Sequence, residues 1–112
     1  MKLAIVVRKD LGMRTGKIAA QVAHAAIAAY IHSNANVRDT WYTEGQKKIV
    51  LKAQDEPHLL RIAQLATSNG LRVENIIDFG LTQIEPNTLT CIAIGIDEDV
   101  KIESVTKDLQ LL

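Results

Sequence analysis

Apolar residues along the chain occur in two spacings, which predict strands alternating with helices. Residues Lys2–Arg8 hold an unbroken apolar run, Leu3–Val7, between charged positions. A continuous run of this kind favours a strand that is covered on both faces. Further apolar runs predict strands over Gln46–Ala53, Val73–Phe79 and Leu89–Ile96.

Helical spacing governs the segments between these runs. A long helix is predicted from about Thr15 to Ser33, because apolar positions recur there every three or four residues. A second helix is predicted after Asp55, a good N-cap, with Pro57 in its first turn and Gly70 as its stop. The remaining segments are a short acidic helix over Asp97–Val105, a packed tail at Leu109–Leu112, a polar irregular segment at Asn34–Glu44 and a loop at Thr82–Asn87.

This order of elements predicts one domain over residues 1–112, with the α/β class of fold. Strands separated by helices imply crossover connections and helices on both faces of a sheet. We therefore expect a three-layer α/β/α sandwich with a four-stranded mixed, mostly parallel sheet. The direct link between the last two strands should make one neighbouring pair antiparallel.

The amino-acid composition excludes several classes of protein. Hydrophobic residues make up 47% of the chain and charged residues 23%, as in an ordinary globular domain. The single cysteine, Cys91, excludes an internal disulfide and a cysteine-based zinc site, and its apolar surroundings favour an inert buried thiol over a reactive one. We find no apolar stretch of membrane-spanning length, and Met1–Arg8 is too short for a signal peptide. A soluble cytoplasmic protein is expected.

Charge is distributed unevenly although the net charge is zero. Residues 1–52 carry nine Lys or Arg and three Asp or Glu, a net of +6, whereas residues 53–112 carry four and ten, a net of −6. This asymmetry is compatible with a basic face for nucleic acid, and equally with two halves that neutralise each other in the fold.

The most informative segment lies at the start of the long helix. Thr15 can cap this helix, and Gly16 allows a ligand to approach the backbone. Arg14 and Lys17 place two cations in or beside the first turn, where each is unfavourable by roughly 0.3–1 kcal/mol. An anion at this helix terminus, such as a phosphate or a developing oxyanion, would compensate for them. The alternative is that both side chains extend into solvent.

Two further features mark candidate chemistry. Lys17, Gln21 and His24 follow one another at i, i+4 and i+7 and form a polar stripe, which on an amphipathic helix is more often a solvated or loop-contacting face. Asp78 ends a strand that we expect to be internal, and carboxylates at such strand ends often face a ligand crevice. The alternative for Asp78 is a turn cap before Gly80.

Three segments together resemble the type 2 peptidyl-tRNA hydrolases, the archaeal and eukaryotic family. They are residues 16–26 of the long helix, residues 44–52 of the second strand and residues 78–90 around Asp78, and the Leu109–Leu112 segment also matches. The resemblance covers essentially the whole chain. It departs from the family at three positions, where Val22, Phe79 and Leu81 replace a usual Cys, a small residue and an Arg. The loss of that Arg removes a possible phosphate contact.

The resemblance implies an enzyme that hydrolyses the ester between a peptide and the terminal ribose of its tRNA, with no metal or organic cofactor, and it also implies a homodimer. Asp78 would orient or deprotonate the attacking water, and Lys17 would stabilise the oxyanion or the leaving oxygen. The other residues that it implicates are Thr82 and Thr90 in positioning the water or the terminal adenosine, and Gln21, His24 and Gln83 in substrate binding. The candidates for phosphate contacts are Lys9, Arg14, Lys47 and Lys48.

Two rival functions fit the same sequence. One is an RNA- or tRNA-binding module on this fold without catalytic activity. The other is a protein-interaction domain in which Trp41 and Tyr42 anchor a partner, although an aromatic pair is more often ordinary packing. An assay of peptide release from peptidyl-tRNA separates all three functions.

Overall fold

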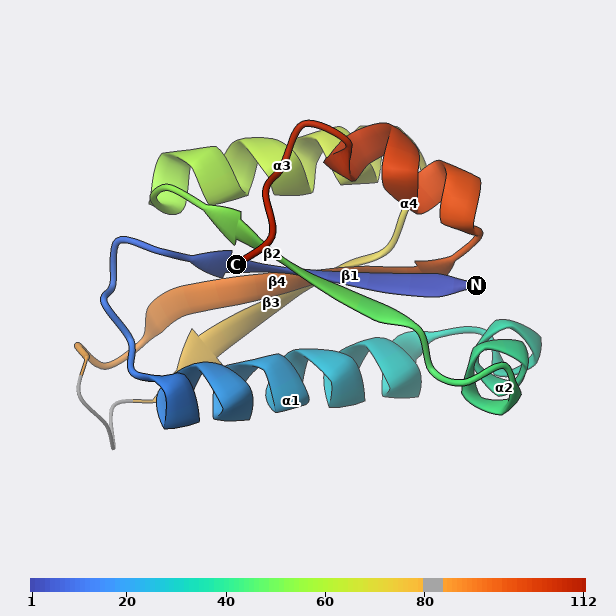
Figure 1. Ribbon diagram of the computed structural model, residues 1–112, viewed down its shortest axis with the longest axis horizontal. Coiled ribbons are helices and arrows are strands. Elements are labelled where there is room, and N and C mark those ends of the chain that lie inside the picture. Colours follow the sequence, from blue (N-terminus) through green and yellow to red (C-terminus); the bar gives the residue numbers. More distant parts are fainter. Residues whose placement is uncertain (80–83) are drawn as a thin grey trace.

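A computed structural model describes residues 1–79 and 84–112, which form a sheet between two layers of helices (Figure 1). The helices are α1 (Thr15–His32), α2 (Ala35–Thr43), α3 (Glu56–Ser68) and α4 (Asp99–Thr106). The strands are β1 (Lys2–Arg8), β2 (Lys48–Ala53), β3 (Val73–Asp78) and β4 (Thr88–Asp97). Helices α1 and α2 lie on one face of the sheet, and α3 and α4 lie on the other. The expected α/β class and the four-stranded mixed sheet are confirmed.

The sheet has the strand order β2-β1-β4-β3, which corrects two of our expectations. Only β1 and β2 pair in parallel, whereas β4 is antiparallel to both of its neighbours, so the sheet is not mostly parallel. The segment between β3 and β4 is too short for a crossover, which needs about a dozen residues, so these strands must run in opposite directions. Strand β3 also lies at an edge of the described sheet rather than inside it, because β4 occupies the place beside β1.

Apolar side chains fill both faces of the sheet. On one face, Ala25 and Ala29 of α1 are completely buried, and their small size allows the helix to lie close to the strands. On the other face, Leu59 and Ile62 of α3 and Ile102 of α4 are the buried contacts. Burial of a side chain such as Leu59 stabilises a fold by roughly 1.5–3 kcal/mol. The two helical layers therefore hold the ends of β1, β3 and β4 in fixed positions.

The segment that we expected to be irregular, Asn34–Glu44, contains α2, so that expectation was wrong. Asn34 caps the helix by accepting a hydrogen bond from the Asn36 N–H, 2.9 Å away. Trp41 is only 3% exposed, and its indole N–H donates to the Lys47 carbonyl. One deeply buried aromatic side chain thus holds α2 against the rest of the protein. The polar composition of this segment is the reason why the helix was not predicted.

Two helix caps and the C-terminal tail complete the local structure. Asp55 caps α3 as predicted, through the His58 N–H. Thr15 does not cap α1: the N-cap is Arg14, with no side-chain hydrogen bond. The tail runs along the outer edge of β2, where the Lys52 N–H donates to the Gln110 carbonyl and the Leu112 N–H donates to the Val50 carbonyl. The tail therefore covers one of the two sheet edges.

Candidate active site

The first turn of α1 and the last residue of β3 bring two charged side chains together. Lys17 Nζ lies 2.7 Å from Asp78 Oδ1, and the two side chains are only 7% and 6% exposed. Their arrangement follows from the fold, because α1 packs across β3 and β4 with its N-terminus at the end of the sheet where β3 stops. An ion pair this well shielded interacts more strongly than one in bulk water.

Asp78 also explains the unusual first turn of α1. This turn contains no acidic residue, although the N-terminus of a helix favours negative charge. The Asp78 carboxylate, which comes from β3, supplies this negative charge. It is the anion that the two cations of the first turn, Arg14 and Lys17, led us to expect. Gly16 is exposed, and a methyl group added to it would meet no other atom of the described residues within 4 Å. Among residues 1–79 and 84–112, none therefore crowds this position of the helix terminus.

A buried hydrogen bond supports the site from behind. Thr90 of β4 is completely buried, and its hydroxyl lies 2.6 Å from Gln21 Oε1 and 3.2 Å from the Ile76 carbonyl. A hydroxyl has one proton, so the shorter contact is the stronger donation. The Gln21 side chain is only 3% exposed. Thr90 therefore contacts Gln21 rather than the open space in front of the site.

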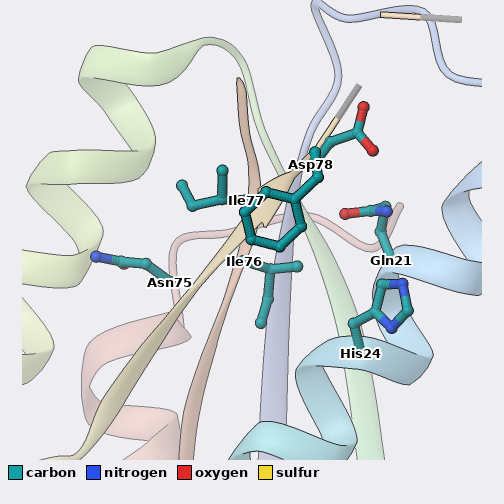
Figure 2. Close-up of a pocket in the computed structure, with 7 residues that line it drawn as sticks. Gln21, His24, Asn75, Ile76, Ile77 and Asp78 are labelled. Carbon is teal, nitrogen blue, oxygen red and sulfur yellow. The ribbon is translucent and has the colours of Figure 1, made fainter. Parts of the chain in front are cut away.

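A cavity of about 470 Å³ opens along the edge of β3 and includes Asp78 in its wall. Gln21 and His24 form its α1 side, and Asn75, Ile76 and Ile77 form its β3 side (Figure 2). Of the predicted polar stripe, Gln21 and His24 thus line the cavity, and Lys17 contacts Asp78 of β3. His24 is exposed, as is Phe79, which also lines the cavity and is 80% exposed. The site combines a charged pair, amide groups and apolar surface.

Comparison with known proteins identifies the family. A family model described as "Peptidyl-tRNA hydrolase PTH2" matches residues 1–112. The chain belongs to this family. Similar proteins named peptidyl-tRNA hydrolase come from Thermoplasma acidophilum, 48% identical over 99% of this chain and 97% of the relative, and from Methanocaldococcus jannaschii, 46% identical over 100% of both. A third, from Haloquadratum walsbyi, is 48% identical over 99% of both.

Membership of the PTH2 family makes the protein an enzyme of a hydrolase family. The basic residues that we predicted as phosphate contacts lie in two places. Lys9 follows β1, and its N–H donates to the Ala53 carbonyl, at the same end of the sheet as Lys17 and Asp78. Arg14 begins α1 at that end. These two predicted phosphate contacts therefore lie at the same end of the sheet as the site.

Lys47 and Lys48 lie at the opposite end of the sheet. Lys48 is aligned with Leu3, which is aligned with Gly95, seven residues along β4 from Thr88, the partner of Asp78. At about 3.3 Å per residue this separation is roughly 23 Å. Their charges are also engaged: Lys47 pairs with Asp99, which lowers the pKa of that carboxyl, and Lys48 lies 5.0 Å from the Trp41 ring centre. The predicted basic residues thus form two groups rather than one face.

Two predicted site residues, Thr82 and Gln83, lie outside the described residues. Asn75 and Ile77 were not predicted from the sequence as cavity residues, because both occupy ordinary positions of a predicted strand. Only the edge position of β3 exposes them, and that position depends on pairing between distant segments.

Several side chains outside the candidate site have structural roles. Arg8 donates to the Leu89 carbonyl and pairs with Asp10, whose hydrogen bond raises the pKa of Arg8 and lowers that of Asp10. Cys91 is buried as predicted, and burial raises the pKa of its thiol to about 11. Trp41 packs internally, whereas Tyr42 is 55% exposed.

In the described part of the chain, no helix is long and apolar enough to cross a membrane, and no three His, Cys, Asp or Glu side chains gather as a metal site requires.

Proposed function

We propose that the protein hydrolyses the ester bond of peptidyl-tRNA, which releases the peptide and free tRNA. The observation that carries this proposal is the Lys17–Asp78 pair, whose Asp78 lines an open cavity, in a chain of the peptidyl-tRNA hydrolase family. The relatives named above bear the same activity in their names. The pair supplies a carboxylate for water and an ammonium group for developing negative charge.

In the proposed mechanism, Asp78 accepts a proton as a water molecule attacks the ester carbon. The oxygen of the resulting tetrahedral intermediate carries the negative charge, and Lys17 donates a hydrogen bond to it. An ammonium group has three N–H donors, and the bond to Asp78 Oδ1 uses one of them. When the carbon–oxygen bond breaks, the proton held by Asp78 passes to the departing ribose oxygen. A positioned base and one oxyanion donor are each worth roughly 10²- to 10³-fold in rate.

The neighbouring residues position these groups. Thr90 is fully buried, so we propose that it acts through Gln21, whose amide it holds beside the cavity. His24 faces the same cavity and is proposed to contact the peptide end of the substrate. Thr82 and Gln83, outside the described residues, are proposed to position the water and the terminal adenosine.

The tRNA body is proposed to contact the basic residues at the site's end of the sheet. Lys9 and Arg14 lie at the same end of the sheet as the pair, so phosphates next to the terminal adenosine would meet them first. Lys47 and Lys48 lie roughly 23 Å further along the strands and would contact a more distant part of the tRNA. These contacts predict binding that weakens as the salt concentration rises.

We also propose that the enzyme works in the cytoplasm as a homodimer. The alanines Ala25 and Ala29 pack on their own sheet, so they do not supply the interface. The outer side of α1 instead presents Ile27 and Ile31, which are 58% and 59% exposed, and Tyr42 of α2 is also exposed. This apolar surface supports an interface between two copies.

The experiment that tests the function measures peptide and tRNA release from purified peptidyl-tRNA. Wild type should release both, and Asp78→Asn and Lys17→Ala should each reduce release at least 100-fold. Lys107→Ala, an exposed residue outside the candidate site and the proposed tRNA contacts, is the control and should retain cleavage. Tight tRNA binding by wild type without any cleavage would instead support a non-catalytic tRNA-binding module.

A further inference from the structure

The open edge of β3 runs directly into the candidate active site. The opposite edge of the sheet, on β2, is covered by the tail residues Gln110–Leu112. In residues 1–79 and 84–112, by contrast, no strand or bridge pairs with the outer side of β3. An open strand edge presents rows of N–H and C=O groups that pair readily with an extended peptide.

The pairing of β3 with β4 shows which backbone groups face outward. The Gly95 N–H donates to the Arg72 carbonyl, which makes these two residues a hydrogen-bonded pair. Such pairs alternate along an antiparallel ladder, so Glu74 and Ile76 also direct their backbone groups toward β4. Asn75, between them, therefore directs its N–H and C=O toward the open edge. Asn75 and Ile77 line the cavity that contains Asp78, as Figure 2 shows.

We propose that the peptide part of the substrate binds as an added strand along the edge of β3. This inference rests on the proposed function, which places the ester carbon beside Asp78. The peptide's C-terminal residue carries the ester, and Asp78 ends β3, so the peptide chain extends back toward Asn75. It consequently runs parallel to β3, with its backbone bonded to Asn75 and its side chains directed to either side.

The chemistry of this edge suits a substrate whose sequence varies. Backbone hydrogen bonds are the same for every peptide, so they supply affinity without requiring particular side chains. The apolar wall of Ile77 and Phe79 accepts side chains of different shapes, and both residues are substantially exposed, at 37% and 80%. The occupant to which we commit is therefore an extended peptide of any sequence, carried on tRNA.

The geometry sets the length of peptide that is recognised. Asn75 lies three residues before Asp78, which corresponds to about 10 Å along a strand. An N-acetyl-aminoacyl group spans less than two residues and cannot reach Asn75. A peptide of four residues can reach it and form two backbone hydrogen bonds there, one to the N–H and one to the C=O of Asn75.

The test compares two substrates, an N-acetyl-aminoacyl-tRNA and a tRNA that carries a four-residue peptide. The readout is the ratio of their kcat/KM values, longer over shorter. For wild type we expect a ratio of roughly ten, from two hydrogen bonds that each contribute a few-fold. Asn75→Pro removes the outward N–H in an edge position that tolerates proline, and should lower the ratio roughly three- to tenfold. Asn75→Ala keeps the N–H and should retain the wild-type ratio.

A second series uses the wild-type enzyme, so it does not depend on the folding of a variant. Single N-methyl groups are placed at successive amides of the tRNA-linked peptide. Because backbone donors face a strand edge at every second residue, kcat/KM should fall roughly three- to tenfold at alternate positions only. Equal values at all positions, or an unchanged ratio for Asn75→Pro, would overturn the inference. A change in oligomeric state of Asn75→Pro with an unchanged ratio would assign the edge to contacts between copies instead.

Failure of this inference is distinguishable from failure of the proposed function. If wild type cleaves both substrates with equal kcat/KM, the hydrolase function holds and the added-strand proposal does not. If wild type cleaves neither substrate, the proposed function itself fails.

Discussion

Lys17 and Asp78 are 61 residues apart in the sequence, yet their side chains meet at 2.7 Å. Neither side chain is more than 7% exposed, so the two opposite charges interact largely away from water. The pair belongs both to the stability of the fold and to the proposed chemistry. These two contributions respond differently to substitution, which makes them separable.

Removal of one charge should therefore differ from removal of both. Lys17→Met and Asp78→Asn, made singly, should each lower the free energy of unfolding by about 3 kcal/mol, because each removes one partner of a buried 2.7 Å ion pair. The double variant should lose clearly less than the sum of the two. All three should lose at least 100-fold in kcat/KM. Urea denaturation and ester cleavage measure the two effects, and simple additivity of the stability losses would contradict the pairing.

Substitutions of the buried Thr90 hydroxyl should also separate an effect on stability from an effect on kcat/KM. Thr90→Val leaves the Gln21 oxygen without its 2.6 Å donor, and should lower stability by about 1–3 kcal/mol and kcat/KM several-fold. Thr90→Ser keeps the hydroxyl and should recover most of the lost kcat/KM. Denaturation and steady-state kinetics on the same preparations test this. Equal activity of the Val and Ser variants would remove the hydroxyl from any positioning role.

The sequence predicted the elements better than their arrangement. Lys2–Arg8 was predicted with the bounds of β1, because an unbroken apolar run between charges is a local signal. The order of the strands depends on pairing between distant segments, and it places β4 between β1 and β3. Helix α2 was missed for a related reason, since its stability depends on the burial of Trp41 beneath other elements.

In the candidate site, too, the individual residues could be predicted from the sequence better than their arrangement in space. Lys17 and Asp78 were predicted as site residues from their places at a helix start and a strand end, and from the family resemblance. Their direct contact, and the cavity beside them, required the three-dimensional arrangement. The edge position of β3 was the reverse of the interior position expected from its apolar residues, and it is this edge that exposes Asn75.

The two groups of basic residues should differ in their response to salt. Lys9→Gln and Arg14→Gln should each reduce the slope of log kcat/KM against log salt concentration by about 0.7–0.9, the value for one phosphate contact. Lys47→Gln should change it less, because Lys47 lies at the opposite end of the sheet from the candidate site. Measurement over a series of KCl concentrations tests this. A larger change for Lys47→Gln than for Lys9→Gln would shift the tRNA path to the far end of the sheet.

Cys91 should remain unreactive in the native protein and should destabilise it in alkali. Burial raises its pKa from 9.0 to about 11, so between these values the unfolded thiol loses its proton while the folded thiol retains it. Stability should accordingly fall as the pH rises from 9 to 11, by about 2 kcal/mol at pH 11. Cys91→Ala should lack this part of the decline, whatever its stability at neutral pH. Urea denaturation across this range measures it, and parallel curves for the two proteins would refute the assignment.

The tail tests the idea that an uncovered sheet edge is a binding surface. Deletion of residues 110–112 removes the hydrogen bonds to Lys52 and Val50 and exposes the edge of β2. We expect a loss of about 1–2 kcal/mol in unfolding free energy and concentration-dependent association that wild type does not show. Leu111→Lys keeps the backbone of the tail at a side chain that is 66% exposed, so it should remain close to wild type in both respects. Light scattering and denaturation supply the measurements. If the deletion neither destabilises the protein nor promotes association, a bare strand edge on this fold does not attract another chain, and the argument for peptide binding along β3 is weakened with it.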